Sequence, residues 1–312
     1  MYFLKKCRVN YGIYALVLIL LVSLLGGCCN QKVTQTEQEE NMIQSLIPAE
    51  DETDSQSDTE ESNKAGESEE TSLQSEEMSI QLVVENGDYL IEILQKLVDL
   101  GWGDSVEQLL NRLDEMDRSP FRVWSQIPNA KERAFIAEGY IAPGTYCWPE
   151  SASLEEVLGQ LLGSWDLLLD ETMEAEANRQ GYTIDEILIM ASIVEWESSV
   201  DPYQIVKPDV AAVVRNRVES ETALQMDVTI FYLQDALAPY RDAEQFEASY
   251  DTYLRSTLPA GPIGSPSLES VKAVLAPADT QNLFFVYDEE GNYYFAEDYD
   301  QHLRNCQLAG IE

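Results

Sequence analysis

The sequence predicts an α+β fold in which a small strand-and-helix module precedes a larger, mainly helical body. Three observations predict it: alternating apolar residues followed by helical spacing after residue 79, an apolar helix near the middle, and renewed alternation near the C-terminus. The 312 residues are 45% hydrophobic, which is enough for a sizeable core. The net charge of −38 repels phosphate backbones, so we do not expect a nucleic acid partner.

The first 28 residues have the pattern of a secretory signal. The apolar run Ile13–Leu25 covers roughly 20 Å, which is short of a ~30 Å hydrocarbon core. The residues that follow, Leu25-Gly26-Gly27-Cys28, resemble the lipobox of bacterial lipoproteins, which implies lipidation of Cys28. An uncleaved signal anchor starting near Tyr11 is the alternative. Both interpretations predict a chain on the extracytoplasmic face of the bacterial cell membrane, anchored at its N-terminus. The positive charges before the run are Lys5, Lys6 and Arg8.

Residues 29–78 are predicted to form a disordered acidic linker. The stretch from Gln31 to Met78 is rich in acidic and small polar residues, has no aromatic residue, and has only Lys32 and Lys64 as basic residues. Such a composition buries too little apolar surface to offset the entropy lost on ordering. Repulsion between its like charges keeps the linker extended.

Residues 79–130 are predicted to form the small module. Ser79–Val84 alternates like a strand, and Glu85–Asp88 is a turn signal. Helical spacing follows over Tyr89–Leu100, and a second helix is expected over Ser105–Asp114 with Ser105 as its N-cap.

Residues 131–312 are predicted to form the larger body. Its best-signalled helix starts after Thr183, because Thr183 and Glu186 match a capping box. Earlier helices and a C-terminal hairpin complete the prediction. The expected helices are Leu154–Gly163, Asp166–Gln180 and Ile184–Ser198, and the expected strands are Asn282–Tyr287 and Tyr293–Phe295.

The scarcity of histidine and the cysteine spacing limit the available chemistry. His302 is the one histidine, and the five cysteines include no C-x-x-C pair, so we expect no metal site and no cofactor. We expect His302 to be structural, and we do not expect Cys147 and Cys306 to pair. Catalysis by this chain would therefore depend on carboxylates, hydroxyls or lysine.

The predicted helix after Thr183 is apolar on nearly all sides, so it should lie in a core, and it ends in Glu195 and Glu197. A carboxyl group at the edge of an apolar core has a raised pKa and can act as a general acid near neutral pH. The alternative is that both side chains are solvated in an exposed last turn. Helical periodicity does not choose between the two glutamates.

A resemblance to a known family does choose. The segment Ala191–Ser198 resembles the helix that carries the catalytic glutamate in the MltG (YceG-like) family, and the resemblance implies that Glu197 is the catalytic residue. Six further segments resemble that family in the same order, and residues 79–130 resemble a shortened form of its LysM-like N-terminal region. The six segments are Ala137–Tyr146, Val210–Val218, Leu224–Tyr232, Tyr250–Tyr253, Leu258–Ile263 and Ala276–Thr280.

The resemblance implies a YceG-like lytic transglycosylase domain that cuts peptidoglycan glycan strands with 1,6-anhydro ring formation, Glu197 acting first as acid and then as base. It also implies association with cell-wall synthesis complexes. Val228, Asp251 and Ala260 depart from the family pattern, so a weakly active or inactive peptidoglycan-binding lipoprotein is an alternative, and a solute-binding lipoprotein is another. The residues expected to bind substrate are Glu138, Asn216, Gln225, Asp227, Thr229 and Tyr253.

Overall fold

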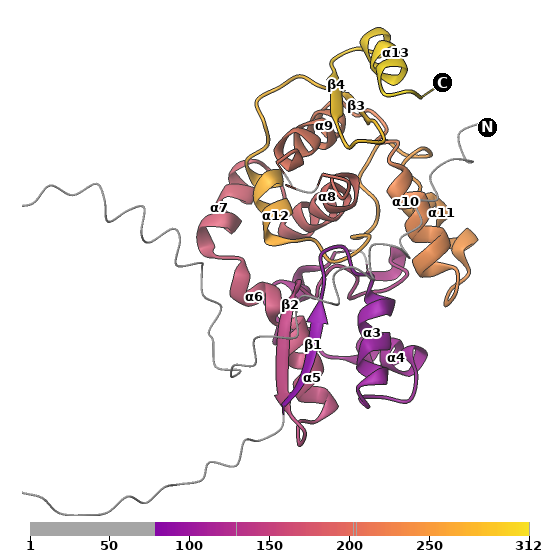
Figure 1. The fold of residues 1–312 in the computed structure, drawn as a ribbon. Coiled ribbons are helices and arrows are strands. Elements are labelled where there is room, and N and C mark those ends of the chain that lie inside the picture. The colour runs from indigo at the N-terminus through magenta and orange to yellow at the C-terminus, as the bar shows by residue number, and fades with distance from the viewer. Residues whose placement is uncertain (1–78, 129, 202, 204, 312) are drawn as a thin grey trace, which may run out of the picture. The chain divides into compact units, whose positions relative to one another are not determined.

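The computed structural model describes residues 79–311 except for residues 129, 202 and 204 (Figure 1). The predicted signal segment, Cys28 and the predicted linker lie outside the described residues. Within the described part of the chain, no helix has both the length and the apolar character needed to cross a bilayer.

The first elements match the prediction closely. Strand β1 spans Ser79–Val84, helix α3 spans Leu90–Asp99 and helix α4 spans Val106–Glu115. Alternate residues of β1, Leu82 and Val84, are buried, as a strand with one core-facing side requires. The side chain of Ser105 accepts a hydrogen bond from the backbone N–H of Gln108, which confirms it as the N-cap of α4.

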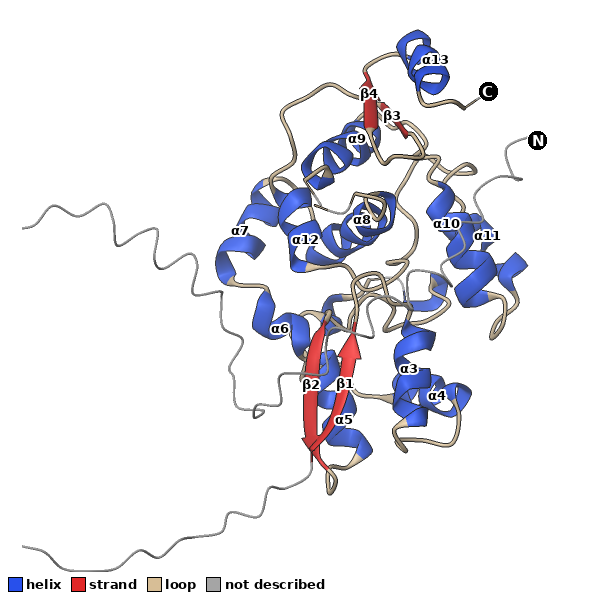
Figure 2. Cartoon of the chain, in the orientation of Figure 1, coloured by secondary structure: helices blue, strands red, loops and turns tan. Residues whose placement is uncertain are grey.

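The partner of β1 was not predicted. Strand β2, Gly144–Pro149, pairs antiparallel with β1 in a register that sets Ser79 opposite Pro149 and Val84 opposite Gly144 (Figure 2). The sequence of this segment predicts turns because its strand conformation depends on a partner 60 to 70 residues earlier in the chain. Strand pairing therefore joins residues on either side of position 130.

Helix α5 spans Leu154–Leu162, and two shorter helices follow it: α6, Ser164–Leu168, and α7, Glu171–Arg179. The prediction of one helix over Asp166–Gln180 is wrong. Asp170 is extended, and its carboxylate accepts hydrogen bonds from the backbone N–H groups of Thr172 and Met173, which starts a new helix.

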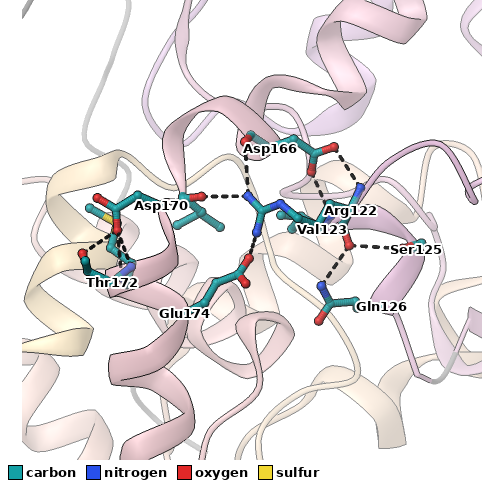
Figure 3. A network of polar contacts seen from close by, with 10 residues as sticks. Arg122, Val123, Ser125, Gln126, Asp166, Asp170, Thr172 and Glu174 are labelled. Carbon is teal, nitrogen blue, oxygen red and sulfur yellow. Dashed lines mark hydrogen bonds and ion pairs between the residues drawn. The ribbon is translucent and has the colours of Figure 1, made fainter.

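Arg122 fixes the turn between these two helices (Figure 3). Its guanidinium donates to the carbonyl of Leu169 at 2.7 Å and forms an ion pair with Glu174. In return, the carboxylate of Asp166 accepts hydrogen bonds from the backbone N–H groups of Arg122 and Val123, each at 2.8 Å. The loop after α4 is therefore tied to both α6 and α7.

Helix α8, Ile184–Glu197, lies at the centre of the larger body and packs against α9, Lys207–Glu219, and α12, Leu268–Leu275 (Figure 1). The capping box of Thr183 and Glu186 is present. Nearly every residue from Ile184 to Glu195 is buried, so the prediction of a core helix is confirmed.

The remaining elements are shorter helices, turns and a hairpin. The predicted hairpin is confirmed, with β3 and β4 paired antiparallel and Phe284 opposite Ala296. Together with the β1–β2 pair it makes the described fold a mixed one, mainly helical with two small sheets. The elements are 3₁₀ turns at Trp124–Gln126, Ala130–Glu132 and Ala243–Gln245, α10 at Asp227–Phe231, a π-helical turn at Tyr232–Leu237, α11 at Glu247–Tyr250, β3 at Phe284–Tyr287, β4 at Tyr293–Ala296 and α13 at Tyr299–Leu308.

Two contacts hold earlier segments of the chain against α8. The ring of Tyr89, before α3, stacks on Trp196 of α8 with 5.0 Å between centroids. Arg133 donates to both carboxylate oxygens of Asp185 in the first turn of α8, at 2.7 and 2.6 Å. Both ends of the helix are therefore fixed by residues that precede it by more than 50 positions.

Candidate active site

The two glutamates at the end of α8 have different surroundings. Glu195 is 6% exposed, and its Oε2 accepts hydrogen bonds from Lys207 Nζ at 2.8 Å and from the backbone N–H of Ser267 at 3.0 Å. The hydroxyls of Ser267 and Ser270 also donate to it. Burial raises the pKa of Glu195, but Lys207 and the two serines outweigh burial, so the pKa lies below its ordinary value. Glu195 is therefore a charged structural anchor between α8, α9 and α12.

Glu197 is partly buried and has few donors around it. Burial, followed by the negative charge of Asp227, raises its pKa from 4.5 to about 8. The positive charge of Arg217 and a hydrogen bond from the backbone N–H of Val228 act in the opposite direction and do not cancel the rise. At neutral pH the carboxyl group of Glu197 is therefore mostly protonated and can donate a proton. The pKa is therefore shifted in opposite directions for the two glutamates, a difference that helical periodicity does not show.

Asp227 and Tyr253 lie beside Glu197 and form a pair. The hydroxyl of Tyr253 donates to Asp227 Oδ1 at 2.6 Å. Asp227 begins α10 and is exposed, and Tyr253 is 47% exposed. Both side chains therefore combine a position next to the carboxyl group with access to solvent, as substrate contacts require.

Arg217, in α9, completes the charged surroundings and was not singled out by the sequence. Its Nη1 donates to the carbonyls of Ala223 and Leu224 at 3.1 and 2.5 Å, and its Nε donates to the carbonyl of Leu283 at 2.5 Å. The guanidinium also lies 5.0 Å from the ring centre of Phe284. Burial lowers the pKa of Arg217, and the nearby Tyr253 and Glu197 partly restore it. The sequence signal was its place beside Asn216 in the segment Val210–Val218.

Tyr293, in β4, is the second residue that the sequence missed. Its hydroxyl donates to the backbone carbonyl of Glu197 at 2.7 Å. Only its aromatic strand setting marked it in the sequence, because the two residues are 96 positions apart.

Two of the predicted substrate-binding residues, Asn216 and Thr229, donate side-chain hydrogen bonds to backbone carbonyls, and a third, Gln225, has an exposed side chain. The amide of Asn216 donates to the carbonyls of Thr280 and Asn282, at 3.0 and 2.9 Å. Thr229 is fully buried, and its hydroxyl donates to the carbonyl of Met226 at 2.8 Å. Gln225 has an exposed side chain, a left-handed φ of 52°, and a backbone N–H that donates to Thr252. Asn216 and Thr229 therefore hold the loops that carry the site.

Glu138 lies in the core, away from solvent. It is 1% exposed, and its Oε1 accepts a hydrogen bond from the backbone N–H of Leu90 at 2.9 Å. Burial raises its pKa to about 8, against the opposing effect of Leu90 and of the Tyr232 hydroxyl. The structure therefore places Glu138 between the N-terminal elements and the larger body, where its carboxyl group accepts a hydrogen bond from the first turn of α3.

The described residues contain no cluster of acidic, histidine or cysteine side chains that could hold a metal ion. His302, in α13, stacks on Phe284 with 5.2 Å between ring centres, and its Nε2 lies 3.7 Å from the sulfur of Cys306. No disulfide joins Cys306 to Cys147 in this part of the chain.

These features define a mixed helical and β domain built around a core helix that ends in one protonatable glutamate. The sequence model of the YceG-like family matches residues 32–308, and the chain belongs to this family. A crystal structure of a YceG-like protein from Listeria monocytogenes has a similar fold, with a TM-score of 0.62 and 24% sequence identity over 72% of this chain and 75% of that one.

Two curated relatives carry the name endolytic murein transglycosylase. The one from Streptococcus pneumoniae serotype 2 is 29% identical over 176 residues, which are 54% of this chain and 31% of that protein. The one from Bacillus subtilis strain 168 is 27% identical over 238 residues, which are 72% of this chain and 63% of that protein. The chain thus spans about a third of the pneumococcal relative and less than two thirds of the Bacillus relative.

Proposed function

We propose that this chain is a peptidoglycan lytic transglycosylase in which Glu197 is the catalytic acid and base. The observation that carries the proposal is the carboxyl group of Glu197, which is partly buried at the end of a core helix and has a pKa raised to about 8. Membership of the YceG-like family and two relatives named endolytic murein transglycosylase support the same substrate class.

In the proposed reaction, Glu197 transfers its proton to the oxygen of the β-1,4 bond between N-acetylmuramic acid and N-acetylglucosamine. The bond from C1 to that oxygen breaks, and an oxocarbenium-like state develops at C1. The Glu197 carboxylate then removes the proton from the muramoyl C6 hydroxyl, whose oxygen closes on C1 as a 1,6-anhydro ring. The proton lost in the first step is regained in the second, so no water and no second nucleophile is consumed, unlike in the two-carboxylate hydrolases.

The neighbours of Glu197 support each half of this cycle. Asp227 keeps the acid protonated by raising its pKa. Arg217 limits that rise, which helps the carboxylate exist as a base in the second half. The phenol of Tyr253 holds Asp227 through their 2.6 Å hydrogen bond.

The test is a Glu197→Gln variant of the full-length chain, purified in detergent and incubated with peptidoglycan. Mass spectrometry should detect anhydromuropeptides from the parent chain and a loss of about 10²–10⁴-fold in the variant, the usual contribution of a general acid. Glu150→Gln, in an exposed turn after β2, is the matched control and should behave like the parent. Undiminished product from Glu197→Gln would refute the assignment and leave a peptidoglycan-binding role.

We further propose that residues 79–130 form a shortened LysM-like module and residues 131–312 the transglycosylase domain. The order of β1, α3 and α4 supports the first assignment, and the glutamate-bearing helix α8 supports the second. A partnership with cell-wall synthesis complexes belongs to the same proposal and rests on the resemblance to the YceG-like family alone.

We also propose an extracytoplasmic, membrane-anchored location, with Cys28 as the lipidated residue and residues 29–78 as spacer. The support is the sequence pattern of positive charges, apolar run and Leu25-Gly26-Gly27-Cys28. Cells fed labelled palmitate should label the parent chain and a Cys29→Ala control but not Cys28→Ala. Label in the Cys28→Ala chain would contradict lipidation at that residue.

A further inference from the structure

The hairpin of β3 and β4 contacts the end of the glutamate-bearing helix at its last residue. The hydroxyl of Tyr293 donates a 2.7 Å hydrogen bond to the backbone carbonyl of Glu197. Carbonyl oxygens in the last turn of a helix have no N–H donor within the helix, so they need hydrogen-bond donors from outside it. The phenol of Tyr293, on a strand far away in the chain, therefore supplies the missing hydrogen-bond donor to the last turn of α8.

The turn of the hairpin makes a second contact next to the first. Gly291 has a left-handed φ of 83°, and a Cβ at this position would lie 3.2 Å from the carbonyl oxygen of Val200. Val200 follows Glu197 by three residues, so the hairpin turn packs against the segment that leaves α8. Glycine suits this position both because of its φ and because of the close approach.

Hydrogen bonds fix both ends of the hairpin. In its turn, Asp288 accepts hydrogen bonds from the backbone and side-chain nitrogens of Asn292, at 2.8 and 2.9 Å. At its base, Arg217 donates to the carbonyl of Leu283. The hairpin is thus attached to α9 at one end and to α8 at the other.

The ring of Tyr293 is held by aromatic neighbours. It stacks on Phe295 with an interplanar angle of 17°, and its centroid lies 5.2 Å from that of Tyr287. Packing of this kind fixes the direction of the hydroxyl, because the ring has only two side-chain torsions. Burial, with Tyr287 and Glu197 nearby, raises the pKa of Tyr293, so the phenol stays a donor.

We propose that Tyr293 is a positioning residue that fixes the last turn of α8 and thereby aims the carboxyl group of Glu197. This inference rests on the proposed transglycosylase activity. The Tyr293 hydroxyl donates its hydrogen bond to the Glu197 carbonyl. Loss of the hydroxyl should therefore disturb the position of the Glu197 carboxyl group more than the affinity for glycan. Misplacement of a catalytic group by about 1 Å can lower a rate up to ~10²-fold.

The test compares Tyr293→Phe with Tyr294→Phe in the full-length chain in detergent, assayed on soluble glycan strands. Tyr294 is the matched control because its hydroxyl donates to Asp288, inside the same hairpin, at 2.9 Å. We expect Tyr293→Phe to lower kcat about 10-fold or more with KM changed less than about twofold. A freed last turn also hydrates Glu197 and lowers its pKa from about 8, so the alkaline limb of the rate profile should move to lower pH. Tyr294→Phe should retain the parent values.

A second variant tests the same contact without touching the tyrosine. Gly291→Ala should press on the Val200 carbonyl and lower kcat in the same way. Gly310→Ala is its control, because Gly310 also has a left-handed φ, 72°, but a Cβ there meets nothing within 4 Å. The inference is overturned if Tyr293→Phe and Gly291→Ala match their controls in kcat and pH profile while Glu197→Gln is inactive. An active Glu197→Gln would instead overturn the proposed function.

Discussion

Glu195 and Glu197 belong to the same last turn of α8, yet the regions that they face have opposite electrostatics. The Glu195 side is a dry contact between helices where a lysine and two serines surround one carboxylate oxygen. The Glu197 side combines partial burial with the negative charge of Asp227. The pKa is lowered in the first region and raised to about 8 in the second. The difference shows that the donors within reach, and not the helix or the residue type, decide which glutamate can act as an acid.

The largest effect on stability is expected from Glu195→Gln. Breaking a buried ion pair by removing one partner typically costs about 3–5 kcal/mol, because the other charge stays buried. The variant should therefore unfold at lower urea concentration at neutral pH. In the parent, the contribution of Glu195 is present above its ordinary pKa of 4.5 and is lost as the pH falls through its lowered folded-state pKa.

Glu195→Gln with Lys207→Met is the control for that prediction, since it removes both charges. Removal of both charges leaves no unpaired charge in the core. The double variant should recover most of the lost free energy of unfolding. A single variant as stable as the parent would show that Glu195 is not the anchor between α8 and α9.

The same substitution two residues later should have the opposite sign. The pKa of Glu197 is raised from 4.5 to about 8, so the parent loses stability as the pH rises from about 4.5 through about 8. Glutamine carries no charge, so Glu197→Gln should be more stable than the parent above pH 8, by about 0.5–2 kcal/mol. Urea unfolding at two pH values measures it. If Glu197→Gln is stabilised by the same amount below pH 4.5 as above pH 8, the cause is a change in packing and not the loss of a charge.

Sequence reasoning reached α8 because its signals are local. Thr183 and Glu186 form the capping box that the spacing predicts, and the apolar run predicts the burial. Strand β2 was missed because its conformation depends on pairing with β1, far away in the chain. The break between α6 and α7 was missed because Asp170 can be either a helix residue or an N-cap, and only the capping contacts decide.

The site was predictable only in part for the same reason. Resemblance pointed to Glu197, and no periodicity could show which glutamate would find Lys207 as a partner. Polar motif residues such as Asn216 and Thr229 stand out in a sequence whether they bind substrate or, as the structure has them, backbone carbonyls. The aromatic strand setting of Tyr293 did not indicate its hydrogen bond to the Glu197 carbonyl, because the two residues are 96 positions apart.

A smaller effect is expected when the negative charge beside Glu197 is removed. Asp227 raises the pKa of Glu197, so Asp227→Asn should lower that pKa and move the alkaline limb of the rate profile to lower pH by about 0.5–1 unit. Tyr253→Phe is the contrast, because it removes the hydrogen bond to Asp227 but leaves the charge, and its limb should move by less than about 0.3 unit. A limb that moves to higher pH in Asp227→Asn would contradict this account of the Glu197 side.

The smallest effect on activity is expected at Glu138, whose pKa is also raised to about 8. Its carboxyl group faces Leu90 and Tyr232 in the core. Although its pKa is raised, the group is therefore out of reach of a glycan. Glu138→Gln keeps an oxygen that can accept from the Leu90 N–H, and activity should change less than about threefold. Glu138→Ala leaves that N–H without its acceptor and should cost about 1–3 kcal/mol of stability. A hundredfold loss of activity in a fully folded Glu138→Gln chain would show that access to solvent beside α8 is the wrong criterion for separating the two acids.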